Sequence, residues 1–160
     1  MNQLKRLACS FGGLGLIPVA PGTFGTLGGV LIAWMLAGAD TYLLWVTAAA
    51  VGLYLVGRGL GDWAEKECRG KDPQWFVLDE VIGYLVAVTW VRGPSLLTLT
   101  VAFVLFRFFD ITKPWPARRL ELRRGGDGIL LDDVAAGVWA FAVLAVLRFT
   151  LLDDAAWSAR

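Results

Sequence analysis

Histidine is absent from this sequence, and its absence excludes several kinds of catalytic site. Imidazole metal sites, serine–histidine–aspartate triads and phosphohistidine chemistry all need that side chain. Cysteine is scarce, since Cys9 and Cys68 are the only two. They are too far apart for a CxxC metal or redox pair and too few for a disulfide-stabilised secreted fold. We therefore expect two ordinary thiols.

Charged residues are also few in this chain. They make up 18% of the 160 residues, whereas hydrophobic residues make up 57% and the mean hydropathy is +0.61. Soluble domains usually have about 25% charged and about 45–50% apolar residues, so the composition argues against an ordinary water-soluble globule. The 15 basic and 14 acidic side chains nearly cancel and form no basic stripe, so no nucleic acid partner is expected. The length fits one domain, residues 1–160.

Five long apolar runs dominate the chain. They cover residues 24–39, 42–57, 81–91, 95–106 and 134–152. A soluble globule of this size could bury two such helices but hardly five. We therefore predict an all-α fold, a multi-helical bundle that is a polytopic membrane protein with about five short apolar helices and interfacial loops. Most runs are shorter than the roughly 20 residues that cross about 30 Å of hydrocarbon, so we expect polar helix ends in the headgroup layer or local thinning of the bilayer.

The distribution of lysine and arginine predicts the orientation in the membrane. Two of these residues precede the first run, four lie in segment 58–80 and six in segment 107–133, which makes twelve of the fifteen. All three segments share one side of the predicted topology, and the positive-inside rule assigns that side to the cytoplasm. Arg148 falls inside the last run, where its side chain must reach the interface or find a partner.

Carboxylates are scarce but cluster at the ends of the apolar runs. Asp79 and Glu80 open the third run, Asp110 follows the fourth, and Asp132 and Asp133 open the fifth, all on the predicted cytoplasmic side. Each pair alone could simply cap a helix N-terminus. Three acidic clusters at one depth would repel one another, however, and a bound cation would offset that repulsion. Oxygen ligands without histidine or a thiolate cluster favour Mg²⁺. The predicted metal ligands are Asp79, Glu80, Asp132 and Asp133, and Asp110 is the predicted base or a further ligand.

Cationic side chains suited to phosphate lie close to these acids. Arg107 and Lys113 are within three residues of Asp110, and we expect both to contact an anionic substrate. The four arginines that follow are better explained by attraction to anionic lipid headgroups. In the turn before the first run, Thr23 or Thr26 could cap a helix whose free N–H groups suit a phosphate oxygen, although capping alone explains them equally well.

Glycines mark two further features. The turn at residues 125–128 could bring backbone N–H groups close to an anion. The pairs Gly25/Gly29 and Gly57/Gly61 could permit close contact between helices. After the second pair, residues 60–69 carry opposite charges at i,i+4 spacing, which is typical of a short surface helix.

Four sequence blocks occur in a specific order: PVAPGT at 18–23, DEVIG at 79–83, FRFFDITKPWP at 106–116 and GGDGILLDDVAAG at 125–137. In these blocks the chain resembles the bacterial phosphatidylglycerophosphatase A family of lipid phosphatases over nearly its whole length. The resemblance implies an all-helical, Mg²⁺-dependent phosphatase of the bacterial inner (cytoplasmic) membrane. It would convert the membrane lipid phosphatidylglycerophosphate to phosphatidylglycerol and inorganic phosphate. The topology above then assigns the active site to the cytoplasmic side.

The inventory of side chains predicts a mechanism for such a hydrolysis. The predicted catalytic residues are Asp110, Asp133 and Lys113, and the predicted substrate-binding residues are Arg107, Lys113 and Thr23. A metal ion held by the carboxylates would neutralise charge on the phosphoryl group and activate the attacking water. A phospho-aspartyl intermediate is the alternative, but the DxDxT pattern of aspartyl phosphatases is absent, as is the CxxxxxR pattern of cysteine phosphatases.

Two functions of other classes stay open. A small divalent-cation carrier or channel subunit also needs carboxylates, but it should carry them near the middle of a span, and no acid lies inside any of the five runs. A structural partner in a lipid-synthesis complex would use the acidic pairs only as helix caps. The sequence leaves the oligomeric state open.

Overall fold

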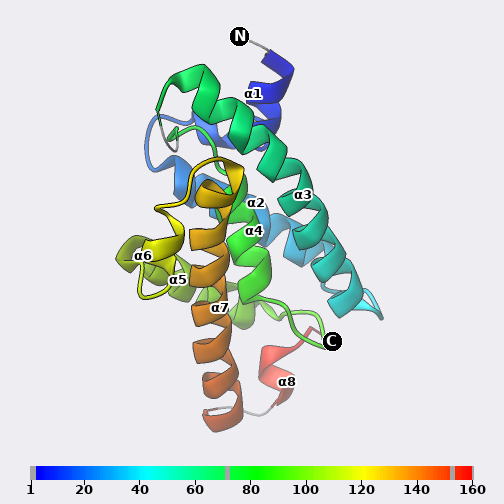
Figure 1. Ribbon diagram of the computed structural model, residues 1–160. Coiled ribbons are helices and arrows are strands. Elements are labelled where there is room, and N and C mark those ends of the chain that lie inside the picture. Colours follow the sequence, from blue (N-terminus) through cyan, green and yellow to red (C-terminus); the bar gives the residue numbers. More distant parts are fainter. Residues whose placement is uncertain (1–2, 71–72, 152–153, 160) are drawn as a thin grey trace.

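The structure is an all-helical bundle, which confirms the predicted fold class (Figure 1). The computed structural model describes residues 3–70, 73–151 and 154–159, and these residues contain no strand. Their helices are α1 (Gln3–Cys9), α2 (Pro21–Leu36), α3 (Tyr42–Cys68), α4 (Leu78–Ala87), α5 (Leu96–Thr112), α6 (Ala117–Leu120), α7 (Gly126–Thr150) and α8 (Asp154–Trp157), with a 3₁₀ turn at Leu14–Leu16.

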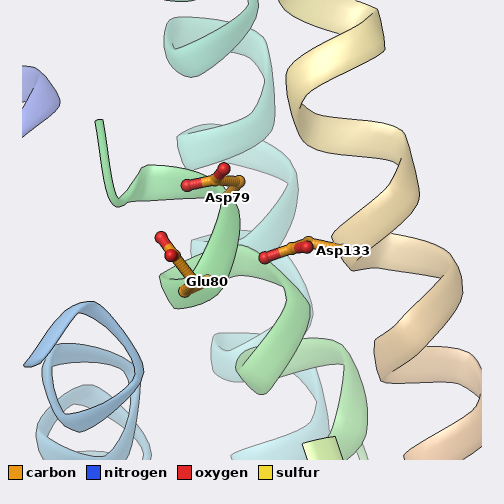
Figure 2. A group of neighbouring side chains, drawn as sticks. All are labelled: Asp79, Glu80 and Asp133. Carbon is orange, nitrogen blue, oxygen red and sulfur yellow. The ribbon is translucent and has the colours of Figure 1, made fainter. Parts of the chain in front are cut away.

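Helices α4 and α7 lie side by side (Figure 2), and their backbones are in close contact at Gly83 and Gly137. A Cβ atom added to Gly137 would overlap the Gly83 carbonyl oxygen, and one added to Gly83 would lie 2.6 Å from the Asp133 carbonyl oxygen. Only glycine permits two helix backbones to approach this closely. The contact therefore sets the register between the first turn of α4 and the second turn of α7.

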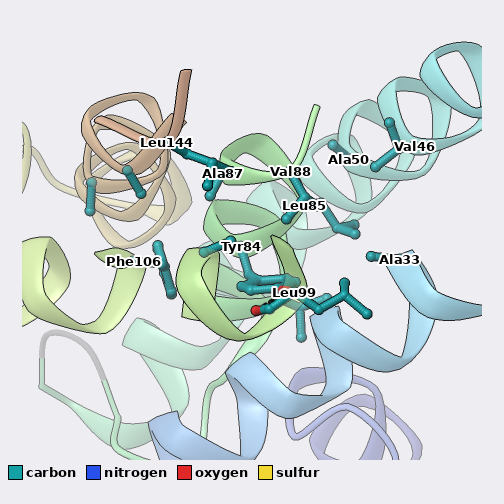
Figure 3. Close-up of a cluster of buried hydrophobic side chains, with 14 of the residues drawn as sticks. Ala33, Val46, Ala50, Tyr84, Leu85, Ala87, Val88, Leu99, Phe106 and Leu144 are labelled. Carbon is teal, nitrogen blue, oxygen red and sulfur yellow. Dashed lines mark hydrogen bonds between the residues drawn. The ribbon is translucent and has the colours of Figure 1, made fainter. Parts of the chain in front are cut away.

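Helix α4 is the central helix of the bundle because it is apolar on nearly all sides. Eight of its ten residues are buried, and α2, α3, α5 and α7 all pack against it. Figure 3 shows Tyr84 of α4 in this core, between Phe106 of α5 and Ala33 of α2. The Tyr84 hydroxyl donates to the Leu99 carbonyl oxygen at 2.9 Å, so the polar end of the buried ring has a partner.

Each predicted apolar run contains a helix, but two helices extend well beyond their runs. Helix α3 continues to Cys68 and includes the surface helix predicted separately at residues 60–69. Helix α7 begins at Gly126, so Asp132 and Asp133 lie in its second turn. The prediction that these two aspartates open the helix is therefore wrong, because the segment before them, from Gly126 to Leu131, is already helical.

The N-terminus of α7 rests against α3. Gly61 lies against Gly126, which confirms close helix contact at this glycine pair. The N–H groups of Gly126 and Gly125 donate to Asp62 Oδ1 at 2.7 Å and to Glu65 Oε2 at 2.9 Å. Carboxylates from another helix thus satisfy the first N–H groups of α7. These N–H groups, which we predicted to approach an anion, bind carboxylates of the chain itself.

Two helices among the described residues, α3 and α7, are long and apolar enough to cross a membrane. Only 17% of the most apolar stretch of α3 is buried, so most of that helix presents apolar side chains outward. Helices α2, α4 and α5 have 16, 10 and 17 residues. Helix α4 is enclosed by its neighbours, so its apolar character serves the core. The five apolar helices are present as predicted, but only two have the length of a membrane span.

Arg148, which lies in the last apolar run, is buried and finds partners within the protein. Its guanidinium donates to the Trp157 carbonyl oxygen at 2.5 Å and lies 4.7 Å from the centre of the Trp90 ring. A cation over an aromatic face is favourable when both are desolvated. This contact ties the C-terminal segment around α8 to the end of α7.

We expect Gly137→Ala to lower the free energy of unfolding by about 1–3 kcal/mol, because the new methyl group collides with the backbone of α4. Urea unfolding in detergent, followed by circular dichroism, measures the change. The control is Gly52→Ala in α3, where nothing lies within 4 Å of the added Cβ, and its stability should stay the same or rise by up to about 1 kcal/mol. Equal stability of the two variants would show that the glycine contact does not constrain the fold.

Candidate active site

The close contact between α4 and α7 brings three carboxylates together (Figure 2). Asp79 and Glu80 lie in the first turn of α4, four and three residues before Gly83, and Asp133 lies four residues before Gly137. Each offers one oxygen, and these oxygens lie within 4.8 Å of one another. In Figure 2 the Asp133 side chain points from α7 toward the first turn of α4. We call Asp79, Glu80 and Asp133 the acidic group.

The acidic group is buried in a way that disfavours its negative charges. Asp79 and Asp133 are only 6% and 4% exposed, and no hydrogen-bond donor among the described residues reaches Glu80 Oε2 or Asp133 Oδ2. Burial raises the pKa of Glu80 to about 7; the hydrogen bond with Asp79 acts against this rise, whereas the charge of Asp110 adds to it. A divalent cation would relieve both the burial of charge and the mutual repulsion. The donor set, which consists of carboxylate oxygens, therefore fits Mg²⁺.

Helix α2 meets the acidic group with its N-terminal end. Its first turn contains Gly22, and a Cβ atom added there would overlap Glu80 Oε1 and lie 3.1 Å from the Arg107 guanidinium. The absence of a side chain at residue 22 thus allows the helix end to touch both an acid and a cation. The positive end of the α2 dipole beside Glu80 partly offsets the negative charge of the site.

Thr23 lies half-buried in this first turn, but neither threonine caps the helix. The residue at the cap position is Ala20, which has a left-handed conformation with φ of 48° and makes no side-chain cap. The Thr26 hydroxyl donates instead to the Gly22 carbonyl oxygen at 2.8 Å. The prediction of a threonine cap is wrong because α2 begins earlier, at Pro21. The role of Thr23 in substrate binding stays a prediction.

Arg107 and Asp110 form an ion pair near the C-terminal end of α5. The Arg107 guanidinium donates to Asp110 Oδ2 at 2.5 Å, and both side chains are mostly buried. The charges of both residues influence the ionisation of Glu80. The ion pair therefore borders the acidic group, and the structure brings Arg107 and Asp110 to the site where the sequence predicted them.

Asp132 does not join the acidic group and instead pairs with Lys113. Lys113 Nζ donates to Asp132 Oδ2 at 2.7 Å and lies 3.0 Å from Glu121 Oε1. Successive residues of a helix point about 100° apart, so Asp132 and Asp133 cannot both face α4. Burial alone would lower the pKa of Lys113, but the hydrogen bonds and charges of Asp132 and Glu121 outweigh it and raise that pKa. Lys113 consequently keeps its positive charge.

Four residues that shape this site were not predicted from the sequence. Gly83 and Gly137 carried a signal, because each follows an acid by four residues, and this spacing puts both on one face of a helix. Gly22 lies in the first of the four blocks, but nothing in that block names its partner in α4. Glu121 had no local signal, since its partner Lys113 lies on the other side of α6.

The fold and the site together define an apolar, all-helical protein whose site suits a phosphate group, with buried carboxylates beside an arginine and a lysine. A family model described as phosphatidylglycerophosphatase A matches residues 7–148. The chain belongs to this family, which confirms the resemblance carried by the four blocks. The protein is accordingly a phosphatase, a phosphoric monoester hydrolase.

Curated relatives are similar over nearly their whole length. The chain is 39% identical over 146 residues to a Bacteroides thetaiotaomicron protein provisionally named a phosphatidylinositol-3-phosphatase, which covers 87% of this chain and 90% of the relative. It is 32% identical to the phosphatidylglycerophosphatase A of Haemophilus influenzae, in an alignment that covers 95% of this chain and 93% of the relative. It is 31% identical to the phosphatidylglycerophosphatase A of Escherichia coli, in an alignment that covers 89% of this chain and 82% of the relative. No solved structure matches the chain.

We expect Lys113→Met to lower the free energy of unfolding by about 1–3 kcal/mol, because it leaves the buried Asp132 carboxylate without its cation. Adding Asp132→Asn to this variant should recover part of the loss, since an amide carries no charge. Urea unfolding in detergent checks both variants. The control is Glu121→Gln, whose 41% exposed side chain should contribute less than about 1 kcal/mol. No recovery in the double variant would contradict the pairing.

Proposed function

We propose that this protein is a Mg²⁺-dependent phosphatidylglycerophosphatase, which hydrolyses phosphatidylglycerophosphate to phosphatidylglycerol and inorganic phosphate. The family and the names of two relatives support the substrate. The acidic group supports the metal and is the observation that carries the proposal. Three carboxylate oxygens lie within 4.8 Å of one another in a buried site, and a bound divalent cation would offset their mutual repulsion.

Asp79, Glu80 and Asp133 would hold the metal ion in this proposal. When bound, Mg²⁺ would offset charge on the phosphate and lower the pKa of the attacking water. Asp132 is not among the proposed ligands, because its carboxylate is held by Lys113 on another side of α7. Asp132, which the sequence predicted as a fourth metal ligand, would instead position Lys113.

The remaining polar side chains would bind and orient the phosphate. Arg107 lies between Asp110 and the end of α2, where its guanidinium can meet a phosphate oxygen beside the acidic group. Lys113 stays protonated, so we assign it electrostatic stabilisation and no proton transfer. Asp110, whose orientation is held by its ion pair with Arg107, is the proposed general base.

The proposed location is the bacterial inner membrane, with the active site facing the cytoplasm. The N-terminal end of α7 lies against the C-terminal part of α3 (Figure 1), so the basic segments 58–80 and 107–133 adjoin at one end of the two potential spans. The positive-inside rule assigns such an end to the cytoplasm. Asp133 lies two turns along α7 from this same end.

We expect purified protein in detergent to release phosphate from phosphatidylglycerophosphate with Mg²⁺ and to stop when EDTA removes it. Asp133→Asn should lower kcat/KM at least about 100-fold while the circular dichroism spectrum stays that of the wild type, because the variant loses a charge needed to hold the cation. The matched control is Asp40→Asn, which changes an exposed aspartate outside the site and should keep full activity.

Three results would contradict parts of this proposal. Undiminished hydrolysis in EDTA would show that no metal is required. Full activity of Asp133→Asn would show that the acidic group takes no part in the reaction. Faster release from phosphatidylinositol 3-phosphate, tested in the same assay, would move the substrate toward that in the name of the Bacteroides relative. If a folded wild-type protein hydrolysed neither lipid, a cation-carrier function would become the better explanation.

The chemical step has its own test. Attack by water leaves no covalent bond between enzyme and phosphate, so rapid acid quenching with ³²P-labelled substrate should leave the protein unlabelled. Label that stays on the denatured protein, and that is lost in Asp110→Asn, would establish an aspartyl-phosphate in place of direct attack by water.

A further inference from the structure

An apolar groove of about 420 Å³ runs between α6 and α7. Its walls include Pro116 and Leu120 on one side and Leu131, Val134, Val138 and Ala142 of α7 on the other. The α7 residues recur at helical spacing and so form one continuous face of that helix. The lining residues are aliphatic or proline except Trp139, whose indole N–H donates to the Trp115 carbonyl oxygen, so the groove suits a hydrocarbon.

The groove begins beside Lys113, the cation proposed to stabilise the phosphate, and its partner Asp132. Leu131 immediately precedes Asp132, and Val134 immediately follows Asp133. The other wall comes from the segment between Lys113 and Glu121, the two residues that form ion pairs across the same gap. The Lys113–Asp132 ion pair, at 2.7 Å, thus joins the two walls of the groove at the end nearest the acids. A molecule with an anionic head and a hydrocarbon tail matches this arrangement of a cation next to an apolar groove.

The length of the groove agrees with such a tail. From Leu131 to Ala142, α7 rises by eleven residues, which is about 16 Å at 1.5 Å per residue. Half of a hydrocarbon core of about 30 Å, the layer that one set of acyl chains fills, is about 15 Å. The volume of the groove also falls within the range of about 300–1,000 Å³ that ligand sites usually have.

We propose that this groove binds one acyl chain of the lipid substrate while the phosphate lies at the acidic group. This inference rests on the proposed function and adds the position of the chain. A second protein copy is a poorer occupant, because a stable protein interface takes about 20–30 residues from each partner, whereas eight residues line this groove.

The test replaces groove residues with a bulky side chain that fills the channel. Ala142→Trp and Val138→Trp alter exposed positions that line it, and Val146→Trp, one turn further along α7 and outside the groove, is the matched control. Each variant is assayed with dioleoyl phosphatidylglycerophosphate in mixed micelles and with the deacylated headgroup, glycerophosphoglycerophosphate. Particle mass is measured by light scattering.

We expect both groove variants to raise KM for the dioleoyl lipid about tenfold with kcat unchanged, because they remove binding that is equal in the ground and transition states. Hydrolysis of the deacylated headgroup should stay at the wild-type rate, and Val146→Trp should match the wild type on both substrates. Unchanged KM for the lipid in both variants would overturn the inference. So would an equal loss on both substrates, or a change in particle mass in place of a change in KM. Failure of the wild type on both substrates would instead reject the proposed function, and the groove assignment with it.

Discussion

The contact of two helix backbones at Gly83 and Gly137 is the constraint on which the site depends. Because α4 and α7 touch there, the residues one turn earlier on each helix must face each other, and these residues are acids. Concentrating carboxylates in a buried site raises the free energy of the apoprotein unless a cation balances them. The packing that holds the bundle together thereby also creates the demand for a positive charge. The N-terminus of α2 and Arg107 supply part of it at the border of the group.

Much of the fold could be predicted because its signal is local. Long apolar runs predicted where the five apolar helices lie. The start of α7 was missed because it begins with Gly126, Asp127 and Gly128, which are poor helix formers, and its capping groups, Asp62 and Glu65, come from a distant helix. The burial of α4 was missed for another reason. Hydropathy measures only how unfavourable contact with water is for a side chain, and it has the same value whether a helix is covered by lipid or by protein.

The candidate site shows the same division between local and long-range information. The five acids were found because acids are conspicuous in so apolar a chain. The separation of these acids into the acidic group and the partner of Lys113 was not predicted. Asp132 and Asp133 are neighbours in sequence, and only the position of α4 decides which of them faces inward. Helix periodicity gives the angle of about 100° between the two side chains, but the direction of the pair depends on tertiary contacts. The pairing of Glu121 with Lys113 could not be predicted from helix periodicity, since Glu121 lies beyond a turn whose path the sequence does not specify.

Depth in the membrane finally separates a lipid phosphatase from a cation carrier. If α7 enters the bilayer at Gly126, Asp133 lies seven residues along it, which is about 10 Å from the helix end. The polar layer of a bilayer is about 5–8 Å thick on each side, so the acidic group would lie near the boundary between headgroups and hydrocarbon. A lipid phosphate already resides at this level, and it could reach the carboxylates without leaving its own leaflet. A carrier would need its acids about 20 Å from the surface, near the middle of the span, and the helix residues at that depth, around Trp139, are apolar. In this placement the headgroup layer would give way to the acyl-chain layer just beyond Asp133, along the stretch of α7 that lines the apolar groove.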